Sequence, residues 1–183
     1  MKYQIDQSGK IENTNVVTVL AICNHCICTV IIPAKTKRQF QEICRQNGLT
    51  RLYVYILFSF GIYALLSQLK DVSQVTIDTE YPGKEKLIDR TIKAFFENSD
   101  IDIKFARIGN KPRVHYAAHD VYAGKKKANK IISLNEILSK MEKTDGRLRE
   151  CLSTLVSIQP RSKNKYYHHQ TKKSREPKLQ SKC

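Results

Sequence analysis

The chain has 183 residues, of which 41% are hydrophobic, so it is long enough and apolar enough to bury one domain-sized core. Its 32 Lys and Arg against 17 Asp and Glu give a net charge of +15, which favours polyanionic partners, either nucleic acid or an anionic membrane. The opening residues MKYQIDQSGKIENTN contain no apolar signal segment. We therefore expect a cytoplasmic protein whose six cysteines are reduced thiols, which argues against a secreted disulfide scaffold.

The N-terminal part of the chain predicts three strands joined by short turns. The first strand is short and alternating, and the next two are rich in β-branched residues. Turn signals separate them at QSGKIEN and NHC, and Pro33 stops the third. The pattern indicates an antiparallel meander with strands at 2–6, 16–23 and 27–34.

Two helices are expected next, at 35–48 and 51–70. The second contains residues 52–69, an 18-residue run without a charge, which is at the short edge of a membrane-spanning helix. A small membrane protein spanning at 52–69 is therefore one alternative. Polar and small residues interrupt the run, and both flanking regions look like parts of one mixed domain. We favour a helix buried in a globular core and do not expect a membrane partner.

The following residues alternate between strands and helices. The strand at 74–78 is apolar on both faces, as expected of a central or parallel strand. After it we expect an amphipathic helix at 83–99, a strand at 101–109, a short helix at 112–124, and a short strand plus helix at 129–143 with Ser133 as the helix cap. A meander followed by alternating units predicts one mixed sheet with helices on its faces.

The sequence divides into a domain and a tail. Residues 1–143 form the predicted α/β domain. Residues 144–183 contain 10 basic and 3 acidic residues, and the periodic pattern decays there. The stretch PRSKNKYYHHQTKKSREPKLQSKC is almost free of aliphatic residues, so we expect a disordered basic tail.

Three carboxylates occupy positions where chemistry is concentrated in mixed sheets. Asp6 ends the first predicted strand, Asp78 ends the fourth, and Asp120 lies in the late short helix. Functional residues of such sheets cluster at the carboxyl ends of the strands. Asp6 and Asp78 share one sheet edge if their strands are parallel neighbours. Converging acids repel one another unless a cation lies among them, and Mg²⁺ prefers oxygen ligands of this kind.

The element order, with IDQSG in the first strand, IDTEY at the end of the fourth and HYAAHDVYAG as a late helix, resembles the ribonuclease H-like superfamily over residues 1–143. That superfamily includes ribonuclease H, transposase and integrase cores, and Holliday-junction resolvases. The resemblance implies a ribonuclease H-like mixed sheet and two Mg²⁺ or Mn²⁺ ions that activate water against a phosphodiester. It implies that Asp6 and Asp78 bridge the two ions and that Asp120 holds the second.

One departure from the family pattern concerns the fourth acid. The family usually supplies a Glu from the first long helix after the meander, whereas residues 51–70 contain no acid. Glu42 in the preceding helix and Glu80 in the loop after Asp78 are the candidates to complete the ligand set, with Glu80 at most auxiliary. The alternative is that these acids are surface carboxylates, or that Asp78 and Glu80 serve the N-terminus of the following helix.

Basic residues near these acids are candidates for phosphate contacts. Lys84 lies at a helix start in YPGKEK, a position that suits a phosphate. The stretch GKKKANK follows the Asp120 helix and supplies Lys125, Lys126, Lys127 and Lys130. It is either a solubilising loop or a patch that contacts the nucleic-acid backbone with a strong salt dependence.

Two further patterns contain residue types that bind metals. CNHCIC at residues 23–28 is half of a zinc site, but the second half is missing, so we favour thiols packed in a hairpin. His115 and His119 stand four residues apart beside Asp120. We expect them either to form a solvated polar face or to lie as auxiliary residues at the rim of the acidic site.

The sequence therefore supports two functions. The first is a metal-dependent nuclease or related protein that acts on phosphodiester bonds in DNA, RNA or a hybrid, with Mg²⁺ or Mn²⁺ as cofactor. The second is a non-catalytic nucleic-acid-binding protein of the same fold that uses Lys125, Lys126, Lys127 and the tail.

Overall fold

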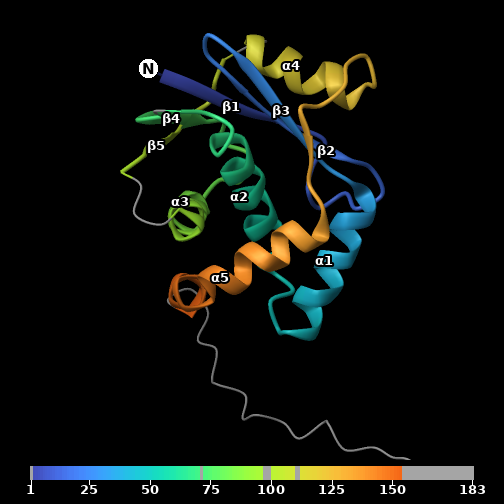
Figure 1. Ribbon diagram of the computed structural model, residues 1–183, viewed down its shortest axis with the longest axis vertical. Helices are drawn as coiled ribbons and strands as arrows, with labels where there is room; N and C mark the ends of the chain where they lie inside the picture. Colours follow the sequence, from blue (N-terminus) through green and yellow to red (C-terminus); the bar gives the residue numbers. More distant parts are fainter. Residues whose placement is uncertain (1, 71, 97–99, 110–111, 154–183) are drawn as a thin grey trace, which may run out of the picture.

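The computed structural model describes residues 2–70, 72–96, 100–109 and 112–153 (Figure 1). Its centre is a six-stranded mixed sheet in the order β5-β4-β1-β2-β3-β6. The strands are β1 (Lys2–Ser8), β2 (Thr18–Cys23), β3 (Ile27–Ile32), β4 (Gln74–Ile77), β5 (Asp102–Phe105) and β6 (Lys130–Ile131). The first three form the predicted antiparallel meander. The others pair in parallel, β4 with β1, β5 with β4 and β6 with β3, so the predicted mixed sheet is confirmed.

Helices lie on both faces of this sheet, as Figure 1 shows, with α4 on one face and the other four helices on the opposite face. They are α1 (Ala34–Gln46), α2 (Tyr53–Leu66), α3 (Glu85–Phe95), α4 (Arg113–Tyr122) and α5 (Leu134–Ser153). The larger hydrophobic core lies between the sheet and α1, α2, α3 and α5. A smaller cluster joins α4 to β2 through Val114, Ala117, Ala118 and Val121 of the helix.

The uncharged segment forms α2, which is a core helix. Twelve of its fourteen residues are buried. At Gly61 an added Cβ would lie 2.1 Å from Leu20 Cδ1, so the glycine allows α2 to approach β2 closely. Burial all round is the packing expected of a helix that is hydrophobic on every side. Among the residues that the structure describes, no helix is long and apolar enough to cross a membrane.

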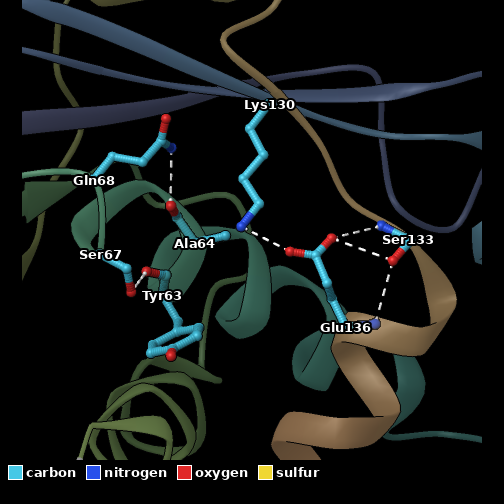
Figure 2. A network of polar contacts seen from close by, with 7 residues as sticks. All are labelled: Tyr63, Ala64, Ser67, Gln68, Lys130, Ser133 and Glu136. Atoms are coloured by element: carbon cyan, nitrogen blue, oxygen red, sulfur yellow. Dashed lines mark hydrogen bonds and ion pairs between the residues drawn. The ribbon is translucent and has the colours of Figure 1, made fainter.

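The start of α5 is fixed by a reciprocal pair of hydrogen bonds, drawn in Figure 2. The Glu136 amide donates to Ser133 Oγ (3.3 Å), and the Ser133 amide donates to Glu136 Oε2 (3.1 Å). This arrangement is a capping box, so the predicted cap at Ser133 is confirmed. Lys130 Nζ lies 2.7 Å from Glu136 Oε1. Lys130 is paired in register with Val30 of the larger core and therefore lies on the face opposite α4.

Helix α5 runs past the predicted boundary between domain and tail. The structure is helical to Ser153, ten residues beyond the expected end at 143. Leu148 and Leu152 are four residues apart, so helical spacing of apolar residues continues past the boundary. The rest of the predicted tail, residues 154–183, lies outside the described residues.

A buried lysine fixes the long connection between β1 and β2. Lys37 is fully buried at the start of α1. Its Nζ donates to Lys10 O (3.0 Å), Asn13 O (2.7 Å) and Thr18 Oγ1 (2.8 Å). These three acceptors satisfy the ammonium donors, although burial lowers the pKa of Lys37 to about 8. The contacts hold the backbone that follows β1 against α1.

We expect Lys37→Met to destabilise the protein by about 2–4 kcal/mol, because it leaves buried acceptors without donors and releases the loop. Urea unfolding followed by circular dichroism measures the change. Lys35→Met, an exposed position on the same helix, is the matched control and should change stability by less than about 0.5 kcal/mol. Equal effects of the two substitutions would contradict the role assigned to Lys37.

Candidate metal centre

Two of the predicted acids meet because their strands are parallel neighbours. Ile5 of β1 is in register with Ile77 of β4, and the Asp78 amide donates to Ile5 O (2.9 Å). Ile5 and Ile77 both belong to the larger core. Since side chains alternate along a strand, the residues that follow them, Asp6 and Asp78, project toward the face that carries α4.

Glu80 joins Asp6 and Asp78 from the loop after β4. Each of the three offers a carboxylate oxygen, and these atoms lie within 4.8 Å of one another. Asp6 is only 6% exposed, while Asp78 and Glu80 are half-buried. The loop is anchored by Tyr81, whose ring packs edge-on against Tyr55 and Phe58 of α2. We call Asp6, Asp78 and Glu80 the acidic cluster.

Hydrogen bonds orient the two aspartates. Asp6 Oδ1 accepts the amide of Gln7 (2.7 Å), and Asp6 Oδ2 lies 2.9 Å from His115 Nδ1. Asp78 Oδ1 accepts the amide of Ile108 (2.9 Å), which follows β5. Backbone donors stabilise a carboxylate without neutralising it. Both aspartates are therefore held as oriented acceptors, Asp78 directly after β4 and Asp6 two residues before the end of β1.

The electrostatics of the acidic cluster favour a cation. Burial, followed by the charges of Asp6 and Asp78, raises the pKa of Glu80 to about 7, and Lys10 offsets part of this effect. Like charges at such close range penalise the third ionisation, and a bound divalent ion would remove that penalty. Three carboxylates are the hard oxygen donors that Mg²⁺ and Mn²⁺ accept. The donor set therefore fits the predicted cofactor.

Two predicted acids lie outside the acidic cluster. Asp120 forms an ion pair with Lys126 (2.9 Å), which holds the pKa of Asp120 below its usual range. It follows His115 by five residues, about half a helical turn out of phase, so it lies on the other flank of α4. Glu42 is exposed on α1 and accepts hydrogen bonds from Arg45 and Gln46 of the same helix. The expectation that Asp120 converges with Asp6 and Asp78 is therefore corrected.

The predicted auxiliary histidines are both on α4. His115 contacts the acidic cluster through Asp6, and the His119 ring stacks on it with centroids 6.3 Å apart. Sequence reasoning missed Lys10, which is close enough to Glu80 to affect its pKa. Its position just after Gly9, in the turn beyond β1, is the signal that points to it.

The predicted basic residues are spread over several surfaces. Lys125 and Lys127 are exposed after α4, next to the ion-paired Lys126. Lys84 is exposed, with its Nζ 5.8 Å from the centroid of the Tyr55 ring. Lys130 lies on the opposite face of the sheet, as described above, so it is not part of the patch predicted around Lys125.

The cysteine-rich hairpin does not assemble a zinc site within the described part of the chain. Cys23 is buried, Cys26 is exposed and Cys28 is half-buried. For the residues described, the acidic cluster is the only group of three Asp, Glu, His or Cys side chains whose ligand atoms converge. The interpretation of packed thiols therefore holds for Cys23 but not for the exposed Cys26.

No protein-family model, curated protein or solved structure matches this chain.

Without divalent ions, we expect Glu80 to make stability fall as pH rises. Glu80 ionises near pH 4.5 when its environment is unperturbed and near 7 in the folded chain, so the folded state binds more protons between these values. The loss of stability caused by ionising Glu80 is absent below about pH 4.5 and complete above about pH 7. Glu80→Gln should remove it and raise stability at pH 8 by about 1–2 kcal/mol, allowing for partial solvent exposure.

The measurement is a series of melting curves in EDTA from pH 4.5 to 8 for both proteins. Glu142→Gln, at an exposed position on α5, is the control and should keep the wild-type slope. If Glu80→Gln is less stable than wild type at pH 8, the Glu80 carboxylate stabilises the fold and the cluster is not repulsive.

Proposed function

We propose that this protein is a metal-dependent nuclease of ribonuclease H-like type that acts on phosphodiester bonds and uses Mg²⁺ or Mn²⁺. The observation that carries the proposal is the acidic cluster, whose three carboxylate oxygens lie within 4.8 Å of one another in a chain of net charge +15. An acidic site in a basic protein suits a polyanion that arrives together with a cation.

The arrangement of the fold supports this proposal. An antiparallel meander is extended by parallel strands on the β1 side, with one acid in the first strand and another directly after the fourth. The ribonuclease H-like resemblance implies the same two positions. Glu80 takes the place of the missing helix acid. Because Asp120 is paired with Lys126, the proposal assigns the ligands to Asp6, Asp78 and Glu80 alone.

Each residue of the site has a distinct task in this proposal. A divalent cation held by Asp6, Asp78 and Glu80 would supply Lewis-acid stabilisation of phosphoryl oxygens and of an attacking water. Asp6 and Asp78 are pre-oriented by the amides of Gln7 and Ile108, so little ordering is needed when a ligand binds. Glu80, with its raised pKa, releases a proton as it becomes a ligand. Lys10 adds positive charge beside this carboxylate.

We expect Asp78→Asn to abolish stabilisation by Mn²⁺ and any metal-dependent cleavage of oligonucleotides. The amide oxygen of Asn can still accept the Ile108 hydrogen bond, and one repulsive charge is lost, so the variant should melt at or above the wild-type temperature in EDTA. Wild type should gain about 2.7 kcal/mol at Mn²⁺ of 100 times its Kd, roughly 5–10 °C in Tm.

Melting curves with and without Mn²⁺, together with cleavage assays on single-stranded, duplex and hybrid oligonucleotides, test the proposal. Asp102→Asn is the matched control, because Asp102 is an exposed aspartate on β5 paired with Lys104. It should respond to Mn²⁺ as wild type does. Stabilisation without cleavage would favour the non-catalytic nucleic-acid-binding function, and no response to Mn²⁺ in wild type would refute the metal site.

A second substitution tests whether Asp120 binds the metal, as the ribonuclease H-like pattern implies. Asp120→Asn should keep the full Mn²⁺ response, because Asp120 lies outside the acidic cluster and binds Lys126. Calorimetric titration with Mn²⁺ measures the affinity of wild type and of the Asp78 and Asp120 variants. A large loss of Mn²⁺ affinity in Asp120→Asn would place Asp120 in the metal site and contradict this assignment.

A further inference from the structure

Helix α4 presents a row of aromatic rings beside the acidic cluster. Its buried side, Val114, Ala117, Ala118 and Val121, packs on the sheet. The rest of the helix carries four rings, those of His115, Tyr116, His119 and Tyr122. Tyr116 is 49% exposed and Tyr122 is 38% exposed, which makes them two of the few exposed large hydrophobic side chains among the described residues. We call these four side chains the aromatic row.

Three rings of the aromatic row, those of His115, Tyr116 and His119, are close to one another and to the acidic cluster. The centroid of the His115 ring lies 6.0 Å from that of Tyr116 and 6.3 Å from that of His119. His115 also contacts Asp6 directly (2.9 Å). A chain lying along the row would therefore pass next to the acidic cluster.

Positive charge lies at both ends of the row. Arg113 is exposed at the start of α4, and Lys125 and Lys127 are exposed just after its end. The one acid of α4, Asp120, is paired with Lys126. Exposed rings flanked by cations match a ligand that has both flat apolar faces and a line of negative charges.

We propose that the aromatic row binds single-stranded nucleic acid, with unpaired bases stacked on Tyr116 and its neighbours and phosphates near Arg113, Lys125 and Lys127. This inference rests on the proposed function and specifies its substrate class. In a duplex the base faces are hidden, so a duplex can use the cations but not the rings. Single strands offer both features, and base–aromatic stacking does not require a particular sequence.

The test is fluorescence anisotropy with full-length protein in EDTA at low salt, so that cleavage does not interfere. The probes are a 15-nucleotide oligothymidylate, an abasic strand of the same length and a 15-base-pair duplex. Wild type should bind the oligothymidylate most tightly. Tyr116→Leu should weaken that binding by at least about 5-fold while leaving the abasic strand unchanged, because only the stacking surface is lost.

Two variants serve as controls. Tyr116→Phe keeps the ring and should keep wild-type affinity. Ile27→Ala removes another exposed hydrophobic side chain, in the β2–β3 hairpin at the opposite end of β1 from Asp6, and should bind as wild type does. Unchanged far-ultraviolet circular dichroism and melting temperature confirm that each variant is folded.

The proposal is overturned if Tyr116→Leu binds the oligothymidylate as wild type does, if the abasic strand binds equally well, or if the duplex is preferred. Binding to anionic vesicles but to none of the three probes would also overturn it. These outcomes are independent of the metal site, because Mn²⁺ stabilisation is measured without nucleic acid. A wild-type Mn²⁺ response with no ring-dependent binding would refute only the substrate class.

Discussion

The parallel pairing of β1 with β4 is the constraint on which the rest of the site depends. The Asp78 amide continues the ladder by donating to Ile5 O (2.9 Å), which places Asp78 beside Asp6. The two isoleucines in register, Ile5 and Ile77, are fully buried in the core below. A slip of one residue would turn Ile77 to the opposite face and bury Asp78. Hydrophobic burial therefore fixes the register that brings two like charges together.

That arrangement is unfavourable on its own, and the structure shows how it is tolerated. The aspartates receive backbone donors from Gln7 and Ile108, while Asp6 also has His115 as a partner. Burial of Glu80, followed by the charges of Asp6 and Asp78, raises its pKa to about 7. Because Glu80 can stay partly protonated near neutral pH, the repulsion among the three carboxylates is reduced and the fold tolerates it without a metal. Under the proposed function, Glu80 would release that proton on binding a cation.

The sequence predicted the strands and the meeting of Asp6 with Asp78, because apolar runs define the strands and the two strands are parallel neighbours. The prediction that Asp6 ends the first strand is wrong, because β1 continues to Ser8. The sequence failed at Asp120 because the resemblance gives a position in a helix but not the helical phase. The burial of Val114, Ala117, Ala118 and Val121 fixes how α4 is rotated against the sheet, and the five-residue spacing then leaves His115 and Asp120 on opposite flanks. The pattern was present in the sequence, so a helical projection would have found the error.

The close approach of Glu80 to Asp6 and Asp78 has a different origin. The orientation of Glu80 depends on Tyr81, which is held by Tyr55 and Phe58 of α2 and hydrogen-bonds to Glu12 Oε2 (3.1 Å). These contacts join segments that are distant in the sequence, and no local pattern in the loop predicts them. Hydrophobic periodicity predicts helices and strands, but it does not predict a loop conformation that depends on tertiary packing. The same holds for Lys10, whose loop is held by the buried ammonium of Lys37.

A single glycine links the strand end to the aromatic row. Gly9 follows β1 with φ of +74°, a conformation that other residues rarely adopt. A Cβ at this position would lie 2.6 Å from both Tyr122 Cε2 and Val17 O. Because Gly9 has no side chain, the Tyr122 ring can lie over the turn and hold the C-terminal half of α4 against β1. The contact between His115 and Asp6 is therefore positioned from two directions, by the buried apolar face of α4 and by the ring that Gly9 admits.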